Sequence, residues 1–283
     1  MKYFPAPAKL NLFLHVVGRR ADGYHLLQSA FRLIDRADEI GIEPRADGVI
    51  RRVNAIDGVS LDSDLCLRAA RLLKERTQSA QGADIELVKR LPIGGGLGGG
   101  SSDAATVLLA LNRLWNTGLS RSRLQQLGAE LGADVPFFVF GESAFAEGIG
   151  DMLTPIALKP AWYLVLVPQA GVSTAEIFGA PELRRNAAPI PAARYADGFG
   201  SNDLEPVTCA RFPDVTRHLN WLNQHATARM TGSGACVFAA FPSAEAARSV
   251  LGSAPAGMQG FVARGLDRHP LYDLALSAGA TPS

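Results

Sequence analysis

The sequence predicts an α+β protein of two domains, the first over residues 1–153 and the second over residues 154–283. In both halves, segments with alternating apolar residues, typical of strands, are followed by segments with apolar residues at helical spacing. The chain of 283 residues also has the length at which one hydrophobic core tends to divide into two. A stretch rich in Pro, Gly and Ala, residues 179–203, is expected to form an irregular excursion within the second domain.

The first strand is predicted over residues 8–17, AKLNLFLHVV, whose side chains alternate with a period of two residues. In that register, Lys9 and Asn11 lie on the same face of the strand and point away from the core. Residues 62–78 then predict a helix that opens with an Asp/Ser cap, and residues 85–91, IELVKRL, predict a strand.

A glycine-rich run follows at residues 91–105, LPIGGGLGGGSSDAA, and a helix is predicted to begin where the glycines end. A further helix is predicted over about 121–131 with Gly132 as its C′ residue, and residues 135–141, VPFFVFG, are expected to form a buried strand. The second domain is expected to alternate strands and helices, with strands at 162–168, 235–241 and 261–266 and helices around 213–226 and at 243–251.

Charge and cysteine content narrow the classes of function that fit. A formal net charge of +1 gives no electrostatic case for DNA, RNA or an anionic membrane, since those partners usually demand a basic face, so an anionic partner is expected to be small. Cys66, Cys209 and Cys236 are far apart and form no C-x-x-C pair, which disfavours disulfides and a zinc site and favours a reducing cytoplasm. No stretch approaches about 18 apolar residues and the amino terminus is unlike a signal peptide, so no membrane span is expected.

The glycine run carries six glycines in the seven positions from 94 to 100. Glycines let backbone N–H groups approach an anion without obstruction by a Cβ, and the start of a helix adds unpaired donors and a favourable dipole. Ser101 and Ser102 follow as capping residues and hydroxyl donors. The run therefore predicts a cradle for phosphate.

Three other interpretations of the run fit less well. The dinucleotide fingerprint G-x-G-x-x-G needs an acidic residue to hold a ribose, and no Asp or Glu occurs between Asp103 and Glu130. The Walker motif fails at Ser101, which stands where its lysine must reach the phosphates. A flexible linker is disfavoured because the run lies directly between a predicted strand and a strong helix.

The run PIGGGLGGGSSDAA resembles the phosphate loop of the galactokinase, homoserine kinase, mevalonate kinase and phosphomevalonate kinase (GHMP) superfamily. Three further stretches resemble that superfamily in the expected order: PAKLNLFLHVVGRRADGYHLL at 7–27, LGADVPFFVFG at 131–141 and TGSGACVFA at 231–239. The resemblance therefore spans most of the chain. It implies an amino-terminal α/β domain like domain 2 of ribosomal protein S5, a carboxy-terminal ferredoxin-like domain, and an active site in the cleft between them.

The particular form of the glycine run, GGGLGGGSSDAAT, is similar to the branch of the superfamily that acts on a cytidine-diphosphate-linked methylerythritol, and the three other stretches agree. The resemblance implies phosphorylation of its 2-hydroxyl by ATP, giving the 2-phosphate and ADP, a step in non-mevalonate isoprenoid precursor synthesis. It also implies that Asp134 takes the hydroxyl proton while Lys9 holds and polarises both reactants. From the residues alone, Asp134 fits a helix or turn cap equally well, but a lone cation in an apolar strand needs a partner such as Asp134.

The resemblance also implies the residues that bind the substrate. Tyr24 and His25 are expected to lie against the cytosine, with Phe178 on its other face. Asn11 is expected to contact the methylerythritol hydroxyls, and the backbone turn TGSG, 231–234, is expected near the substrate phosphates or the catalytic pair. Taken without the resemblance, a Tyr-His pair is more often structural.

On the ATP side, the resemblance implies nucleoside contacts from Lys89 and the dipeptide 64–65. Asp64 departs from the family, which has asparagine there, and capping of the next helix is the alternative role. Mg²⁺ is expected to accompany ATP, with Ser102 as the one candidate ligand. The residues expected at the phosphates are Pro92, Gly94, Gly95, Gly96, Leu97, Gly98, Gly99, Gly100, Ser101 and Ser102.

Three alternatives remain open at this point. A homoserine or mevalonate kinase of the same superfamily gives no reason for aromatic residues at 24 and 178. A non-catalytic nucleotide-binding module gives no reason for Lys9 and Asp134, and a nicotinamide oxidoreductase lacks the acidic residue noted above. The expected partners are therefore ATP and a small-molecule substrate, with neither nucleic acid nor membrane, for a chain that is a monomer or a homodimer.

Overall fold

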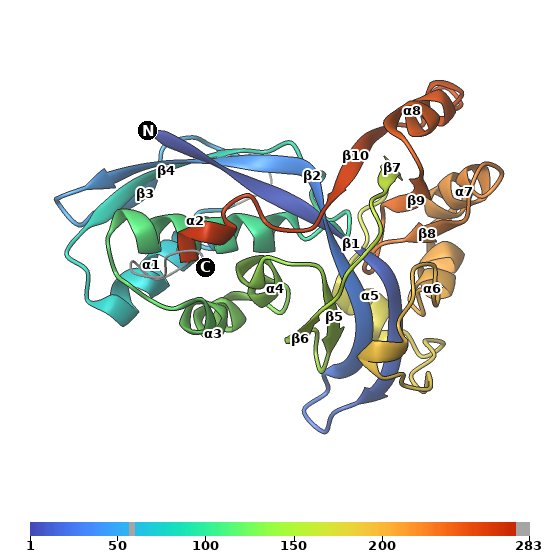
Figure 1. The fold of residues 1–283 in the computed structure, drawn as a ribbon, viewed down its shortest axis with the longest axis horizontal. Helices are drawn as coiled ribbons and strands as arrows, with labels where there is room; N and C mark the ends of the chain where they lie inside the picture. Colours follow the sequence, from blue (N-terminus) through green and yellow to red (C-terminus); the bar gives the residue numbers. More distant parts are fainter. Residues whose placement is uncertain (57–59, 276–283) are drawn as a thin grey trace.

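Two long antiparallel strands, β1 (Lys2–Arg19) and β2 (His25–Arg45), run through the molecule and connect its two halves (Figure 1). They pair from Lys2 opposite Ile42 to Arg19 opposite His25. The structure, a computed structural model, describes residues 1–56 and 60–275. Within those residues the strands form one ten-stranded sheet, whose main path runs β3-β4-β2-β10-β7-β9-β8.

The amino-terminal half is a layer of helices on one face of this sheet (Figure 1). Strand β4 (Gly82–Val88) pairs with β2 on one side and with β3 (Ile50–Arg52) on the other. A hairpin of β5 (Ala144–Glu147) and β6 (Met152–Pro155) pairs with β2 farther along. The helices are α1 (Leu65–Thr77), α2 (Gly99–Leu114), α3 (Arg121–Leu131) and α4 (Val135–Phe140).

The carboxy-terminal half is built on four antiparallel strands, in the spatial order β10-β7-β9-β8. Strand β10 also pairs with β2, with Gly265 opposite Ile34, and this pairing makes the sheet continuous. The strands are β7 (Trp162–Leu166), β8 (Ala228–Met230), β9 (Val237–Phe241) and β10 (Gly260–Leu266). The helices are α5 (Thr174–Gly179), α6 (Glu205–Arg211), α7 (Pro213–Leu222) and α8 (Ala244–Gly252), with a 3₁₀ turn at Ala192–Arg194. A last 3₁₀ turn, Tyr272–Ala275, packs back against α2 in the amino-terminal half.

Three clusters of buried apolar residues form the core. One lies between the amino-terminal strands and α1 to α4, a second packs the carboxy-terminal strands against α6 to α8, and a third joins the halves around Phe13 and Tyr163. The chain crosses between halves, because Leu14 belongs to the second cluster and Leu271 to the first. The predicted boundary at 153/154 lies inside β6 and stays a prediction; residues 276–283 of the predicted second domain lie outside the described part.

Most predicted elements are confirmed, and one is wrong. The strands at 8–17, 85–91, 162–168, 235–241 and 261–266 correspond to β1, β4, β7, β9 and β10, although several differ in length. The helices at 62–78, 121–131, 213–226 and 243–251 correspond to α1, α3, α7 and α8, and the excursion at 179–203 is irregular apart from one short turn.

The segment predicted as a buried strand at 135–141 is the helix α4 and its cap. Its six apolar residues carry no periodicity that separates a buried strand from a buried helix. The residues at the two ends of the segment favour a helix, since Pro136 lies in the first turn and Gly141 ends the helix in the left-handed region with φ +79°. None of the helices within the described residues combines the length and the apolarity that a membrane span requires.

Candidate active site

A cleft with a volume of about 990 Å³ is lined by residues from both halves of the molecule. Its walls include strand β1, the glycine run, the start of α4, helix α5 and residues 232–234. The predicted site residues that line it are Lys9, Asn11, Tyr24, His25, Lys89, Pro92, Gly94, Gly95, Gly96, Leu97, Gly98, Gly99, Gly100, Ser101, Asp134 and Phe178. The fold thus brings together nearly all the residues that sequence analysis singled out.

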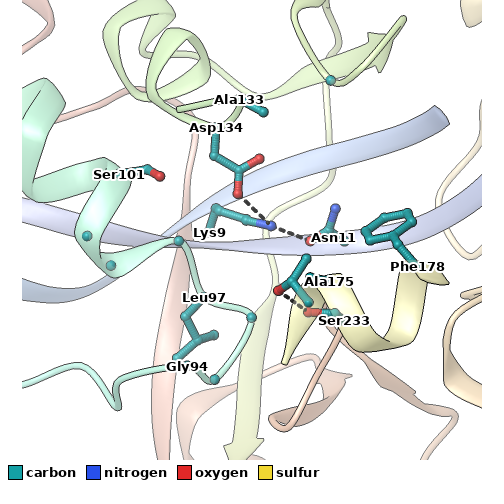
Figure 2. Close-up of a pocket in the computed structure, with 18 of the residues that line it drawn as sticks. Lys9, Asn11, Gly94, Leu97, Ser101, Ala133, Asp134, Ala175, Phe178 and Ser233 are labelled. Carbon is teal, nitrogen blue, oxygen red and sulfur yellow. Dashed lines mark hydrogen bonds and ion pairs between the residues drawn. The ribbon is translucent and has the colours of Figure 1, made fainter. Parts of the chain in front are cut away.

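Lys9 and Asp134 point toward one another across the cleft (Figure 2). Lys9 Nζ lies 3.4 Å from Asp134 Oδ2, with 4% of the Lys9 side chain exposed and 33% of the Asp134 side chain. Asp134 occupies the N-cap position of α4, but its side chain makes no capping hydrogen bond. The carboxylate is therefore directed to the lysine and the cleft, which argues against the alternative that it caps a helix.

Asn11 positions the lysine. Its Oδ1 accepts a hydrogen bond from Lys9 Nζ at 2.5 Å, and its Nδ2 donates to Ser29 Oγ at 2.9 Å. Asn11 is 3% exposed, so the amide expected to contact substrate hydroxyls is already engaged on both sides. Lys9 also lies over the ring of Phe31, 5.2 Å from its centroid, which leaves the ammonium in a largely apolar setting with two polar partners.

The glycine run forms a loop that ends on the first turn of α2. Gly94, Gly96 and Gly98 all have φ between +71° and +76°, a conformation that glycine adopts without strain. Gly98 stands at the N-cap and has no side chain to cap the helix, so the first-turn N–H groups of α2 are left for another acceptor. At Gly96 an added Cβ would lie 2.2 Å from Thr231 O, so this glycine is also required by a close backbone approach.

The segment 231–234 holds the glycine loop from the other half of the molecule. Thr231 Oγ1 donates to Gly96 O at 3.2 Å and accepts from Asn11 N at 3.0 Å. Nearby, Cys236 N donates to Gly95 O at 3.1 Å. The turn expected near the substrate thus also fixes the loop and β1 relative to each other.

The two serines after the loop differ in position. Ser101 lines the cleft, as Figure 2 shows. Ser102 is fully buried and its Oγ donates to Pro7 O at 2.7 Å, which attaches α2 to β1. The prediction that Ser102 meets ATP or Mg²⁺ therefore needs correction, because its hydroxyl faces the core and is already paired.

The far end of the cleft carries the aromatic residues. Tyr24 is 61% exposed, and the rings of His25 and Phe178 pack with their centroids 5.0 Å apart and their planes at 33°. Phe178 comes from α5 and lies beyond Asn11 from Asp134 (Figure 2). His25 Nε2 also accepts a hydrogen bond from Arg185 Nε at 3.0 Å, a contact that no sequence pattern predicts.

Comparison with known proteins decides the family. Two family profiles match the chain, GHMP kinases N terminal domain over residues 64–142 and GHMP kinases C terminal over residues 184–259. A protein of Thiobacillus denitrificans named 4-diphosphocytidyl-2-C-methyl-D-erythritol kinase is 65% identical over 270 residues, covering 95% of this chain and 97% of the relative. The chain belongs to the GHMP kinase family.

Other GHMP kinases agree with this assignment. A Nitrosospira multiformis protein, also named 4-diphosphocytidyl-2-C-methyl-D-erythritol kinase, is 62% identical over 96% of this chain and 93% of its own. A crystal structure of 4-(cytidine 5'-diphospho)-2C-methyl-D-erythritol kinase superimposes with a TM-score of 0.81 at 34% identity, covering 93% of this chain and 99% of that chain. Methanococcus jannaschii mevalonate kinase shares the fold, with a TM-score of 0.69 at 17% identity over 94% of this chain and 98% of its own.

As a GHMP kinase, the protein is an enzyme that uses ATP as phosphate donor for a small-molecule substrate. The two-domain GHMP kinase fold predicted from the sequence is confirmed by the matching domains and the structural neighbours. The oxidoreductase and the non-catalytic module, which sequence analysis left open, are not supported.

Lys89 lies at the edge of this GHMP kinase cleft with two buried carboxylates. Its Nζ pairs with Asp38 and, at 3.0 Å, with Asp103, which follows the first turn of α2. Asp38 is held in turn by the N–H groups of Arg90 and Leu91. Burial raises the pKa of Asp103 to about 8, and the negative charge of Asp38 adds to the rise. Asp103 Oδ1 is buried and has no hydrogen-bond partner within the described residues.

Asp64 has the structural role that was the alternative in the sequence. Its Oδ1 accepts from Cys66 N at 2.7 Å and from Leu67 N at 3.3 Å, which caps α1. Its Oδ2 pairs with Arg52 at 2.8 Å, and both side chains are almost completely buried. The buried arginine explains why a carboxylate can stand at this position of the cleft wall.

Proposed function

We propose that this GHMP kinase transfers the γ-phosphoryl group of ATP to the 2-hydroxyl of 4-diphosphocytidyl-2-C-methyl-D-erythritol. The products are the 2-phosphate and ADP, and the step belongs to non-mevalonate isoprenoid precursor synthesis. One observation carries the proposal: a single cleft holds the glycine loop at one end, the His25–Phe178 pair at the other, and the Lys9–Asp134 pair among its lining residues. The names of the relatives with 55–65% identity support the same substrate.

Asp134 accepts the proton of the attacking hydroxyl. Its side chain is one-third exposed, so an alcohol can reach the carboxylate from the cleft. Phosphoryl transfer has a loose transition state, and the carboxylate contributes mainly by orienting the hydroxyl in line with the phosphorus.

Lys9 stabilises the charge that develops on the transferred group. Its ammonium is 4% exposed and is held by Asn11 and Asp134, so it does not reorganise as the reaction proceeds. A fixed cation in a poorly hydrated position stabilises a transition state more strongly than a hydrated one does.

The triphosphate lies along the glycine loop and the start of α2. The bare backbone of Gly94 to Gly98 and the open first-turn amides of α2 offer N–H donors to phosphate oxygens. Ser101 adds a hydroxyl from the cleft wall, and Lys89, whose charge is paired with Asp38 and Asp103, adds an ammonium donor near the same turn. These residues take the place of the lysine that a Walker loop carries.

Mg²⁺ accompanies ATP in this proposal. Within the described residues no group of three His, Cys, Asp or Glu side chains is placed to hold a metal ion. Mg²⁺ in phosphate sites is held largely by phosphate oxygens and waters, and the Ser101 hydroxyl on the cleft wall is the ligand that this chain would add. When bound, the ion neutralises charge on the β- and γ-phosphates.

The cytidine group occupies the far end of the cleft, where Tyr24, His25 and Phe178 provide aromatic faces and a polar ring edge. We further propose that the enzyme acts in the cytoplasm as a monomer or homodimer, with a domain boundary at 153/154. The three cysteines are free thiols, which suits a reducing compartment.

A substrate panel tests this function. ADP release is measured with the cytidylated methylerythritol, plain methylerythritol, homoserine and mevalonate at equal concentration. We expect turnover with the first compound, with kcat/KM at least about a hundredfold above the others, because only this compound fills the aromatic end of the cleft. A higher kcat/KM for homoserine or mevalonate would show that another GHMP activity is correct.

A further inference from the structure

Arg185 fixes the hydrogen-bonding state of His25. Its Nε donates to His25 Nε2 at 3.0 Å. A guanidinium carries only donors, so His25 Nε2 must accept with its lone pair. Burial, together with the positive charges of Arg185 and Arg19, lowers the pKa of His25, which keeps the ring neutral. A neutral imidazole that accepts at Nε2 carries its hydrogen on Nδ1.

Arg185 is itself held in place. Its NH1 donates to Leu183 O at 2.9 Å, and its NH2 donates to Phe178 O at 3.0 Å and to Ala180 O at 2.6 Å. The same guanidinium thus fixes the imidazole and the backbone of the residue whose ring packs on that imidazole. Among the hydrogen bonds of the described residues, none engages His25 Nδ1, while His25 lines the cleft.

We propose that Arg185 is a positioning residue for base selection, which presents His25 Nδ1–H to the cleft as a hydrogen-bond donor for N3 of a cytosine. This inference rests on the proposed function, which places a cytidine at this end of the cleft. Cytosine N3 is an acceptor, whereas uracil N3 carries a hydrogen, so a uridine compound sets two donors against each other. A site built to pair with one ring atom discriminates strongly against an analogue that leaves its donor unpaired.

The first test is the tautomer of His25 in the wild-type protein. Nitrogen-15 NMR of the imidazoles, with the His25 signals assigned by a His25→Gln variant, reports which ring nitrogen carries hydrogen. We expect hydrogen on Nδ1 and a lone pair on Nε2 at neutral pH. Hydrogen on Nε2 would overturn the proposal, and this readout needs neither a substrate nor an Arg185 variant.

The second test is discrimination between cytidine- and uridine-diphosphate-linked methylerythritol, measured as the ratio of kcat/KM. Arg185→Met is expected to lower this ratio at least about tenfold, through a raised KM for the cytidine compound with kcat changed by less than about threefold. Arg185→Lys keeps a donor and is expected to restore part of the ratio. Arg184→Met is the matched control, because Arg184 is exposed and, within the described residues, its side chain donates a hydrogen bond to Asn186 and none to His25.

A ratio unchanged in Arg185→Met would overturn the proposal. If Arg185→Met does not fold, the kcat/KM ratio of Arg185→Lys and the His25 tautomer of the wild type test the proposal in its place. If the wild-type enzyme turns over neither compound, the proposed function fails, and the His25 tautomer still decides whether Arg185 sets the state of the ring.

Discussion

Lys9 Nζ and Asp134 Oδ2 lie 3.4 Å apart, yet the lysine side chain is 4% exposed and the aspartate side chain 33%. The ammonium of the pair is thus shielded from solvent, whereas the carboxylate is accessible from the cleft. A substrate hydroxyl can approach the carboxylate without displacing the lysine, whose partners Asn11 and Phe31 are part of the protein core. This asymmetry matches the roles proposed for the two groups.

The glycine loop allows a matched pair of substitutions. Gly94 and Gly96 have nearly equal φ values of +72° and +76°, but an added Cβ meets nothing at Gly94 and lies 2.2 Å from Thr231 O at Gly96. Gly94→Ala is expected to cost about 1 kcal/mol in the free energy of unfolding, from backbone strain alone. Gly96→Ala is expected to cost roughly 1–3 kcal/mol more, because the loop and the segment 231–234 must separate. Denaturant unfolding measures both, and equal losses would contradict the close approach.

Ser101 and Ser102 are predicted to separate ATP binding from stability. Ser102→Ala removes a buried hydrogen bond to Pro7 O and is expected to lower the free energy of unfolding by about 0.5–1.5 kcal/mol, with KM for ATP within twofold of wild type, on the order of experimental scatter. Ser101→Ala is expected to leave unfolding unchanged and to raise KM for ATP about threefold to tenfold. Denaturant unfolding and ADP release on the two variants check this. The reverse pattern would restore Ser102 as the phosphate contact.

Asp103 predicts a pH dependence of stability. Its pKa is raised from 3.8 to about 8 by burial and by Asp38, so between these values the folded protein holds a proton that the unfolded chain releases. The stability that this group contributes therefore falls as pH rises through that window, by up to about 1.4 kcal/mol per pH unit. Asp103→Asn keeps a neutral side chain at every pH. Its free energy of unfolding relative to that of the wild type is therefore expected to rise between about pH 5.5 and about pH 8.5. Parallel unfolding curves for the two proteins would contradict the shift.

Local motifs in the sequence were enough to predict much of the site. The glycine run, Lys9 and Asp134 each stand in a short recognisable segment, and the alternation of strands and helices around them is also local. The helix at 135–140 was misread because a six-residue apolar segment has the same pattern in a strand and in a buried helix. The long strand β2 was not anticipated, and it supplies the carboxylate of Asp38 that engages Lys89.

Contacts between distant segments account for what sequence analysis missed. The Thr231 hydroxyl and the Cys236 backbone N–H hold the glycine loop by donating to its carbonyl groups, and no local sequence pattern reveals these contacts. Arg185 lies in the irregular excursion, where a single arginine carries no signal until the fold brings it to His25. The burial of Ser102 depends on how α2 packs on β1. Nothing in the motif itself distinguishes Ser102 from the adjacent serine.

The most direct measurement of the central claim is ADP release with the cytidylated methylerythritol by the wild type and Asp134→Asn, with ATP binding measured on both by calorimetry. Loss of the group that accepts the hydroxyl proton is expected to lower turnover at least about a hundredfold, while ATP binds as in the wild type, because the glycine loop is untouched. Turnover by Asp134→Asn near the wild-type rate would contradict the catalytic role of the Lys9–Asp134 pair.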